Sequence, residues 1–110
     1  MDKKLVAKIE ELIVKALTYS DFGNNRQVVA AAGTPVRLST ESIPCAGVYL
    51  QSLAGNTGLI YWGRDEDRAR AAYGIELEIG AGIWIPIDDA NKVWIDCAVN
   101  GEGVCWVAMV

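Results

Sequence analysis

The chain has 110 residues, 52% of them hydrophobic, and its 14 acidic and 10 basic side chains give a formal net charge of −4 at pH 7. A chain of this length is typical of one domain with a single modest core. The acidic balance argues against a nucleic-acid-binding protein, because such a protein needs a basic face. No apolar run approaches the roughly 18–20 residues of a membrane-spanning helix, so no membrane span is expected.

Residues 1–22 are predicted to form an N-terminal unit built on one amphipathic helix over residues 2–19. Asp2 suits the N-cap position, because an acidic side chain there accepts hydrogen bonds from free backbone N–H groups. Apolar residues recur at heptad spacing and form a stripe on one face of this helix. The stripe residues proposed for self-association or docking are Leu5, Ile9, Leu12, Ile13 and Leu17. Because a helix this short is unstable alone in water, the stripe must pack either on its own domain or on another chain.

Residues 27–110 are predicted to form an antiparallel β-sandwich or a jelly-roll-like barrel of about eight short strands. Apolar and polar residues alternate with the period of two that marks a half-buried strand, and turn-forming residues separate the runs. The strands are expected at residues 27–32, 36–38, 48–50, 59–62, 75–79, 83–87, 93–97 and 104–110. The last strand is apolar on both faces, so we expect it at the centre of a sheet. The order of the strands stays open.

Glycine-rich turns punctuate this pattern. Gly55 and Gly58 bracket a tight connection between antiparallel strands, Gly80–Gly82 is a turn, and Asn100–Gly103 is predicted to form a hairpin. The segment Arg64–Arg70 differs, since six of its seven residues are charged and the charges sum to zero. It is predicted to form a solvated loop or short helical turn, or the charged rim of an interface.

The residues offer little to catalysis. Histidine is absent, which removes the base of a serine or cysteine triad. Asp88, Asp89 and Asn91 are expected to cap a turn rather than to bind calcium, because the spacing lacks the pattern of a calcium loop. We therefore expect no catalytic residue, no cofactor and no metal site, and a protein that is not an enzyme. The three cysteines, Cys45, Cys97 and Cys105, are expected to be buried thiols, with a Cys97–Cys105 bridge as the alternative.

Three tryptophans are candidate docking residues. Trp84 and Trp94 lie opposite the inward-facing residues of their strands, and Trp62 neighbours Tyr61 on the opposite face. Outward aromatic side chains are enriched at protein interfaces, so Trp62, Trp84 and Trp94 favour self-association or docking.

Five segments resemble, in order, a group of small β-sandwich proteins encoded among the virion structural genes of tailed bacteriophages. They are Gly33–Ser39 (GTPVRLS), Ile43–Gln51 (IPCAGVYLQ), Asn56–Gly63 (NTGLIYWG), Gly74–Gly82 (GIELEIGAG) and Ile85–Ile95 (IPIDDANKVWI). The span from the first to the last covers more than half of the chain. The chain departs from the short members of the group in its N-terminal helix and in the charged insertion Arg64–Arg70.

The resemblance implies a non-enzymatic virion part, foremost a capsid decoration (cement) protein, or else a head fibre base or a small tail-associated adaptor. It implies a homotrimer on the capsid surface, made in the host cytoplasm, that binds the major capsid protein or other virion proteins. No catalytic residue comes with the resemblance. The alternative is a carbohydrate or cell-surface binding module, with Trp62, Trp84 and Tyr73 as stacking residues.

Overall fold

The structure is a computed structural model that describes residues 3–8 and 25–110. Residues 3–8 are helical, at the start of the predicted N-terminal helix. Ile9, Leu12, Ile13 and Leu17, four of the five stripe residues, lie outside the described part. Within that part, no helix has the length and apolar character needed to cross a membrane.

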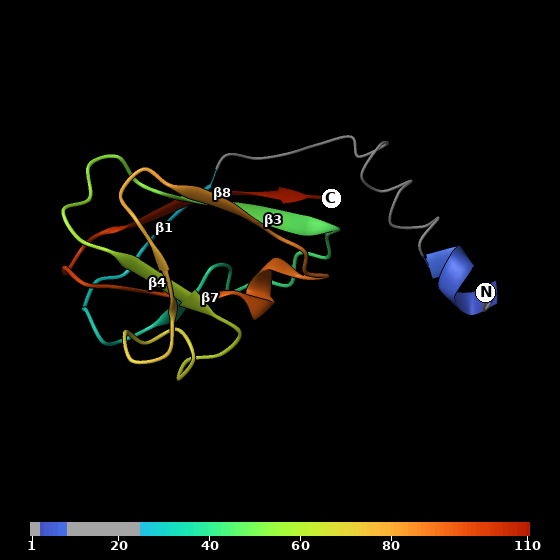
Figure 1. Cartoon of the computed structure of the whole chain (residues 1–110), viewed down its shortest axis with the longest axis horizontal. Helices are drawn as coiled ribbons and strands as arrows, with labels where there is room; N and C mark the ends of the chain where they lie inside the picture. Colours follow the sequence, from blue (N-terminus) through green and yellow to red (C-terminus); the bar gives the residue numbers. More distant parts are fainter. Residues whose placement is uncertain (1–2, 9–24) are drawn as a thin grey trace.

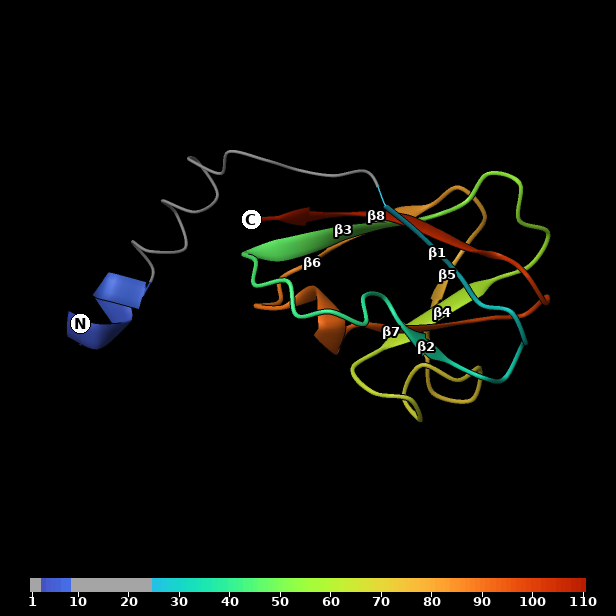
Figure 2. The same ribbon diagram turned by 180° about the vertical axis from the view of Figure 1, so that it is seen from behind.

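The rest of the described chain folds into eight strands in two antiparallel sheets, which confirms the predicted mainly β fold. The strands are β1 (Asn25–Val28), β2 (Val36–Arg37), β3 (Gly47–Ser52), β4 (Ile60–Gly63), β5 (Ile75–Leu77), β6 (Gly82–Ile85), β7 (Trp94–Cys97) and β8 (Gly103–Met109). A short 3₁₀ helix, η1 (Ala90–Lys92), precedes β7. One sheet has the order β1-β8-β3-β6 and the other β2-β7-β4-β5. Figures 1 and 2 show them as two layers.

This strand order is that of a jelly roll. The first strand pairs with the last, and the pairing continues inward as β2 with β7, β3 with β6 and β4 with β5. The chain is therefore folded like one long hairpin that is wound into two sheets, with β8 also bonded to β3 and β7 to β4. As expected, β8 lies inside its sheet, between β1 and β3.

The predicted hairpin at Asn100–Gly103 is wrong, because this turn leads from β7 in one sheet to β8 in the other. The Gly55–Gly58 turn likewise joins β3 to β4 across the two layers. Its Asn56 is buried and donates from Nδ2 to Ser52 Oγ at 2.9 Å and to the Gly103 carbonyl at 2.8 Å. Turns rich in glycine and asparagine thus also connect strands of different sheets. The residues of a turn do not show whether it closes a hairpin or crosses between the sheets.

The core lies between the two sheets. Each inward-facing strand residue at its centre is at most 6% exposed, and the alternation of the strands places these residues on the inner faces. They include Val48, Leu50, Ile85, Val104 and Trp106 from one sheet and Ile60, Leu77, Ile95 and Cys97 from the other. All three cysteines are free. Cys97 is buried on β7 and Cys105 is partly exposed on β8, in different sheets, so the alternative bridge is not formed.

Candidate docking surfaces

The outward face of the β2-β7-β4-β5 sheet is partly covered by the loop 64–74, which joins β4 to β5. Ala69, at the middle of this loop, is fully buried. Gly63 leaves room for the loop backbone, since a Cβ there would lie 2.5 Å from the carbonyl carbon and oxygen of Arg68. In Figures 1 and 2 the loop lies beyond β4 and β7, on the side away from the other sheet. The charged side chains of the insertion are exposed or partly exposed, as predicted, and Ala69 alone of Arg64–Arg70 is buried.

Asp96 lies beneath this cover and is 1% exposed. It points outward from β7, in register with Tyr61 of β4. Its Oδ1 accepts hydrogen bonds from the backbone N–H of Gly33 at 3.0 Å and of Cys97 at 2.8 Å. The buried carboxylate thus ties the turn before β2 to the centre of the sheet. Burial, and then the nearby Asp96 charge, raise the pKa of the Cys97 thiol.

Next to the cover lies the Tyr73 patch, which we define as Trp62, Arg68, Tyr73 and Ile75. Tyr73 is 68% exposed and Ile75 is 52% exposed, although both are large apolar side chains. The Arg68 guanidinium lies 5.7 Å from the centroid of the Tyr73 ring. These residues line a shallow hollow of about 270 Å³. The hollow borders β5, the edge strand of its sheet.

A charged rim adjoins the patch. Arg70 lies 3.3 Å from Glu66 and 3.8 Å from Asp67, and Arg64 lies 3.7 Å from Asp65. All of these side chains are about half exposed or more, so the ion pairs contribute little to stability. An apolar centre beside such a rim is the usual anatomy of a protein interface.

No described loop folds over the outward face of the β1-β8-β3-β6 sheet. We call it the Trp84 face and define it by Val28, Tyr49, Trp84, Cys105, Val107 and Met109. Trp84 is 46% exposed, Tyr49 42% and Val28 46%. The prediction that Trp84 faces away from the core is therefore confirmed. Alternation places Tyr49 on the face opposite Val48 and Leu50, as observed, but Tyr49 was not among the predicted docking residues.

The remaining predicted docking residues lie apart from one another. Trp94 is on the covered sheet, partly buried, with the Arg37 guanidinium 5.1 Å from its ring centroid. Leu5 is 52% exposed in the helical segment. Trp62 and Tyr73 line one hollow, but Trp84 belongs to the other sheet, so these three residues form no common stacking site.

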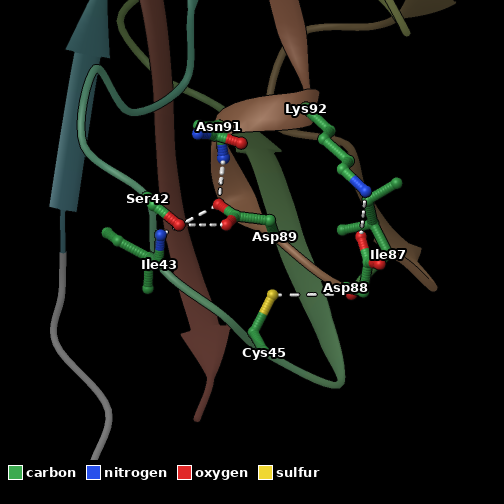
Figure 3. A network of polar contacts seen from close by, with 8 residues as sticks. All are labelled: Ser42, Ile43, Cys45, Ile87, Asp88, Asp89, Asn91 and Lys92. Carbon is green, nitrogen blue, oxygen red and sulfur yellow. Dashed lines mark hydrogen bonds and ion pairs between the residues drawn. The ribbon is translucent and has the colours of Figure 1, made fainter.

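Asp89 closes a polar network at one end of the sandwich (Figure 3). Its carboxylate accepts hydrogen bonds from the Ser42 hydroxyl, from Ile43 N at 2.9 Å and from Asn91 N at 2.9 Å. Asp88 instead points toward Lys92, whose Nζ lies 2.7 Å from Asp88 Oδ1. The prediction of a capped turn is confirmed, because Asp89 is the N-cap of η1. Among the described residues, no cluster of three or more His, Cys, Asp or Glu side chains could hold a metal ion.

Hydrogen bonding lowers the pKa values of these two loop carboxyl groups. The Ser42 hydroxyl, followed by the Asn91 amide, holds the pKa of Asp89 below its ordinary value. The hydrogen bond and the charge of Lys92 do the same for the pKa of Asp88.

Glu102 has a similar structural role at another turn. Its carboxylate accepts from Thr57 N at 2.6 Å, from Gly58 N at 2.9 Å and from the Thr57 hydroxyl at 3.0 Å. Partial burial raises the pKa of Glu102, but these hydrogen bonds together outweigh it and leave the pKa lowered. The carboxylates at the ends of the sandwich therefore hold loops in place, whereas the two patches described above are open for contact with a partner. Comparison of the chain with protein-family models, with curated proteins and with solved structures gave no match.

Proposed function

We propose that this protein is a non-enzymatic structural component of a tailed-bacteriophage virion, foremost a capsid decoration protein. It is made in the host cytoplasm, self-associates as a homotrimer, and binds the major capsid protein or another virion protein at the head surface. The phage assignment rests on the five resembling segments, each of which supplies a strand or a turn of the jelly roll. Jelly rolls are frequent in viral capsids, although the fold alone does not fix a function.

The observation that carries the docking role is the Tyr73 patch. Tyr73 and Ile75 are the most exposed large apolar side chains of the sandwich, and burying them against a partner would stabilise a complex. Arg68 of the patch belongs to the insertion by which this chain departs from the resembling proteins, whereas Trp62 and Ile75 belong to the resembling segments.

The N-terminal stripe is the second contact surface in this proposal. Leu5 is half exposed, as expected for a residue that awaits a partner. One surface can hold the copies together while the other binds the head, because the stripe and the patch belong to different parts of the chain.

The test uses phage heads prepared without the protein, together with the full chain and two variants. Tyr73→Ser alters the patch, and Tyr49→Ser makes the same chemical change on the opposite sheet. Light scattering gives the mass of each protein in solution, and co-sedimentation with heads gives its binding. We expect a trimer that binds heads, with Tyr73→Ser impaired in assembly or in head binding and Tyr49→Ser not impaired.

A protein that stays monomeric and does not bind heads would contradict the proposal. Equal behaviour of Tyr73→Ser and wild type would contradict the assignment of the patch. Labelling of intact virions separates the decoration role from the adaptor role, since an adaptor would be found at the tail or the head–tail junction.

A further inference from the structure

We propose that Tyr49 and Trp84 form a stacking platform for an acidic saccharide, with Arg26 and Gln51 as its polar contacts. This site lies on the Trp84 face and adds a ligand-binding function to the proposed structural role. It does not depend on that role, because it uses the sheet opposite the Tyr73 patch.

The two aromatic side chains lie close over glycines of the neighbouring strand. Tyr49 of β3 is directly opposite Trp84 of β6. A Cβ added to Gly47 would overlap the Trp84 ring, and one added to Gly82 would overlap the Tyr49 ring. Each ring therefore rests on the glycine backbone of the neighbouring strand, and nearly half of each side chain remains accessible to solvent.

A neighbouring pair of exposed aromatic side chains suits the face of a sugar ring. The face of an aromatic ring carries negative charge density, and the C–H bonds on one side of a pyranose are weakly positive. Two neighbouring rings can support adjacent sugar units, and the glycines beneath them fix the rings before the ligand arrives. Such preorganisation lowers the entropic cost of binding.

Polar groups lie in the next row of residues across the same sheet. Arg26, Cys105 and Gln51 are in register across β1, β8 and β3. They run beside the row formed by Val107, Tyr49 and Trp84, about 7 Å away along the strands. A ligand stacked on the aromatic row therefore lies within reach of the polar row.

A shallow hollow of about 500 Å³ joins the two rows. It is lined by Asn25, Arg26, Tyr49, Gln51, Cys105, Trp106 and Val107. Its volume is in the range of small-ligand sites, and its mixture of aromatic and hydrogen-bonding groups is typical of them.

Two polar side chains of the hollow, Arg26 and Gln51, are placed to contact a ligand. Arg26 has no ion-pair partner among the described residues, and it carries the one charge among the described lining residues. The Gln51 amide makes a long hydrogen bond of 3.4 Å to the Gly80 carbonyl. A guanidinium binds a carboxylate with two parallel hydrogen bonds, which is why we infer an acidic sugar such as a uronic acid.

The test titrates the full chain with two probes and follows tryptophan fluorescence and binding heat. One probe is an oligosaccharide of alternating glucuronic acid and N-acetylglucosamine, and the other is a neutral glucose oligomer. We expect the acidic probe to bind more tightly and to change the fluorescence. Trp84→Ala should weaken binding by about tenfold, in line with the loss of an aromatic contact. Arg26→Gln should remove the preference for the acidic probe.

Control variants and a melting measurement separate a specific loss of saccharide binding from a loss of folding. Tyr73→Ala removes an exposed aromatic side chain from the other sheet and should leave saccharide binding unchanged. The thermal melting of Trp84→Ala shows whether this variant is folded, and Trp84→Phe, which keeps an aromatic ring, should retain most of the binding.

The inference would be overturned if neither probe bound, or if Trp84→Ala and Arg26→Gln left the binding unchanged. It would also be overturned if the mass of the protein in solution rose with its concentration and Trp84→Ala abolished this rise. The last outcome would assign the Trp84 face to a second copy of the chain. Failure of this test leaves head binding by the Tyr73 patch unaffected, since the two surfaces are changed by different variants.

Discussion

The two outward faces of the sandwich differ in what covers them. On the β2-β7-β4-β5 sheet the loop 64–74 folds back over its own strands and buries Ala69 and Asp96. On the β1-β8-β3-β6 sheet the described residues provide no such cover, and Tyr49 and Trp84 are exposed. The difference follows from the topology, because β4 and β5 are the one pair of consecutive strands that share a sheet. Their connection can return over that sheet, whereas the other connections between consecutive strands cross between the layers.

The largest expected effect comes from forcing the cover away from its sheet. In Gly63→Ala the new Cβ would meet the Arg68 backbone at 2.5 Å, and backbone cannot rotate aside as a side chain can. We expect this change to destabilise the protein by about 1–3 kcal/mol. Urea denaturation measures the loss. Gly55→Ala is the matched control, since its Cβ would meet nothing within 4 Å and the midpoint should stay unchanged or rise slightly.

A somewhat smaller effect is expected from removing the buried carboxylate under the cover. Asp96→Ala leaves the N–H groups of Gly33 and Cys97 without their acceptor, at a cost of about 1–2 kcal/mol. Asp96→Asn keeps one acceptor oxygen and should lose less stability. Equal losses in the two variants would show that the acceptor is not what stabilises this site.

The reactivity of the cysteines tests the burial of the two sheets in the wild-type protein, without any substitution. Cys105 is partly exposed on the Trp84 face, whereas Cys97 is buried and its raised pKa further reduces the reactive thiolate. Iodoacetamide should therefore modify native protein first at Cys105, as read by mass spectrometry of its peptides. All three cysteines should react in urea. Simultaneous labelling of Cys97 and Cys105 in the native protein would contradict the burial of the core.

The smallest expected effect concerns pH and the loops at the ends of the sandwich. The folded-state pKa values of Asp89 and Glu102 are lowered, so folding favours their charged forms. Their contribution to stability is present above the unfolded pKa of about 4 and is lost as the pH falls through the lower folded values. The urea midpoint should therefore decrease from pH 5 toward pH 3. Glu102→Gln should decrease less steeply over this interval, and a parallel decrease would argue against this contribution.

The strands and their facing residues could be predicted from sequence, because alternation is a local property. Val48 and Leu50 face inward and Tyr49 outward, as period two requires. Alternation does not by itself decide burial at the edge of a sheet, where Ile75, Leu77 and Ile79 alternate with Glu76 and Glu78. Leu77 is buried, but Ile75 is 52% exposed and Ile79 47% exposed. The reason is that β5 is a three-residue strand at the edge of its sheet, which Ile75 begins and which ends at Leu77, before Ile79.

Properties that depend on distant pairing could not be predicted in this way. The hairpin at Asn100–Gly103 was wrong because turn chemistry does not reveal which sheet the next strand joins. Asp96 sits in a strand position that would ordinarily face water, and its burial depends on a loop some thirty residues earlier in the chain. The Trp84 platform likewise needs Gly47 and Gly82, whose closeness to the rings appears only once β3 and β6 are paired.

The place of β8 has a consequence for biosynthesis. This strand is the last of the eight to leave the ribosome, yet it forms the bond between β1 and the rest of its sheet. Until β8 has emerged, β1 and β3 have no common neighbour, and the apolar inner faces of both remain open to solvent. The β1-β8-β3-β6 sheet is therefore completed only once β8 is available, and the core cannot close progressively from β1 onward.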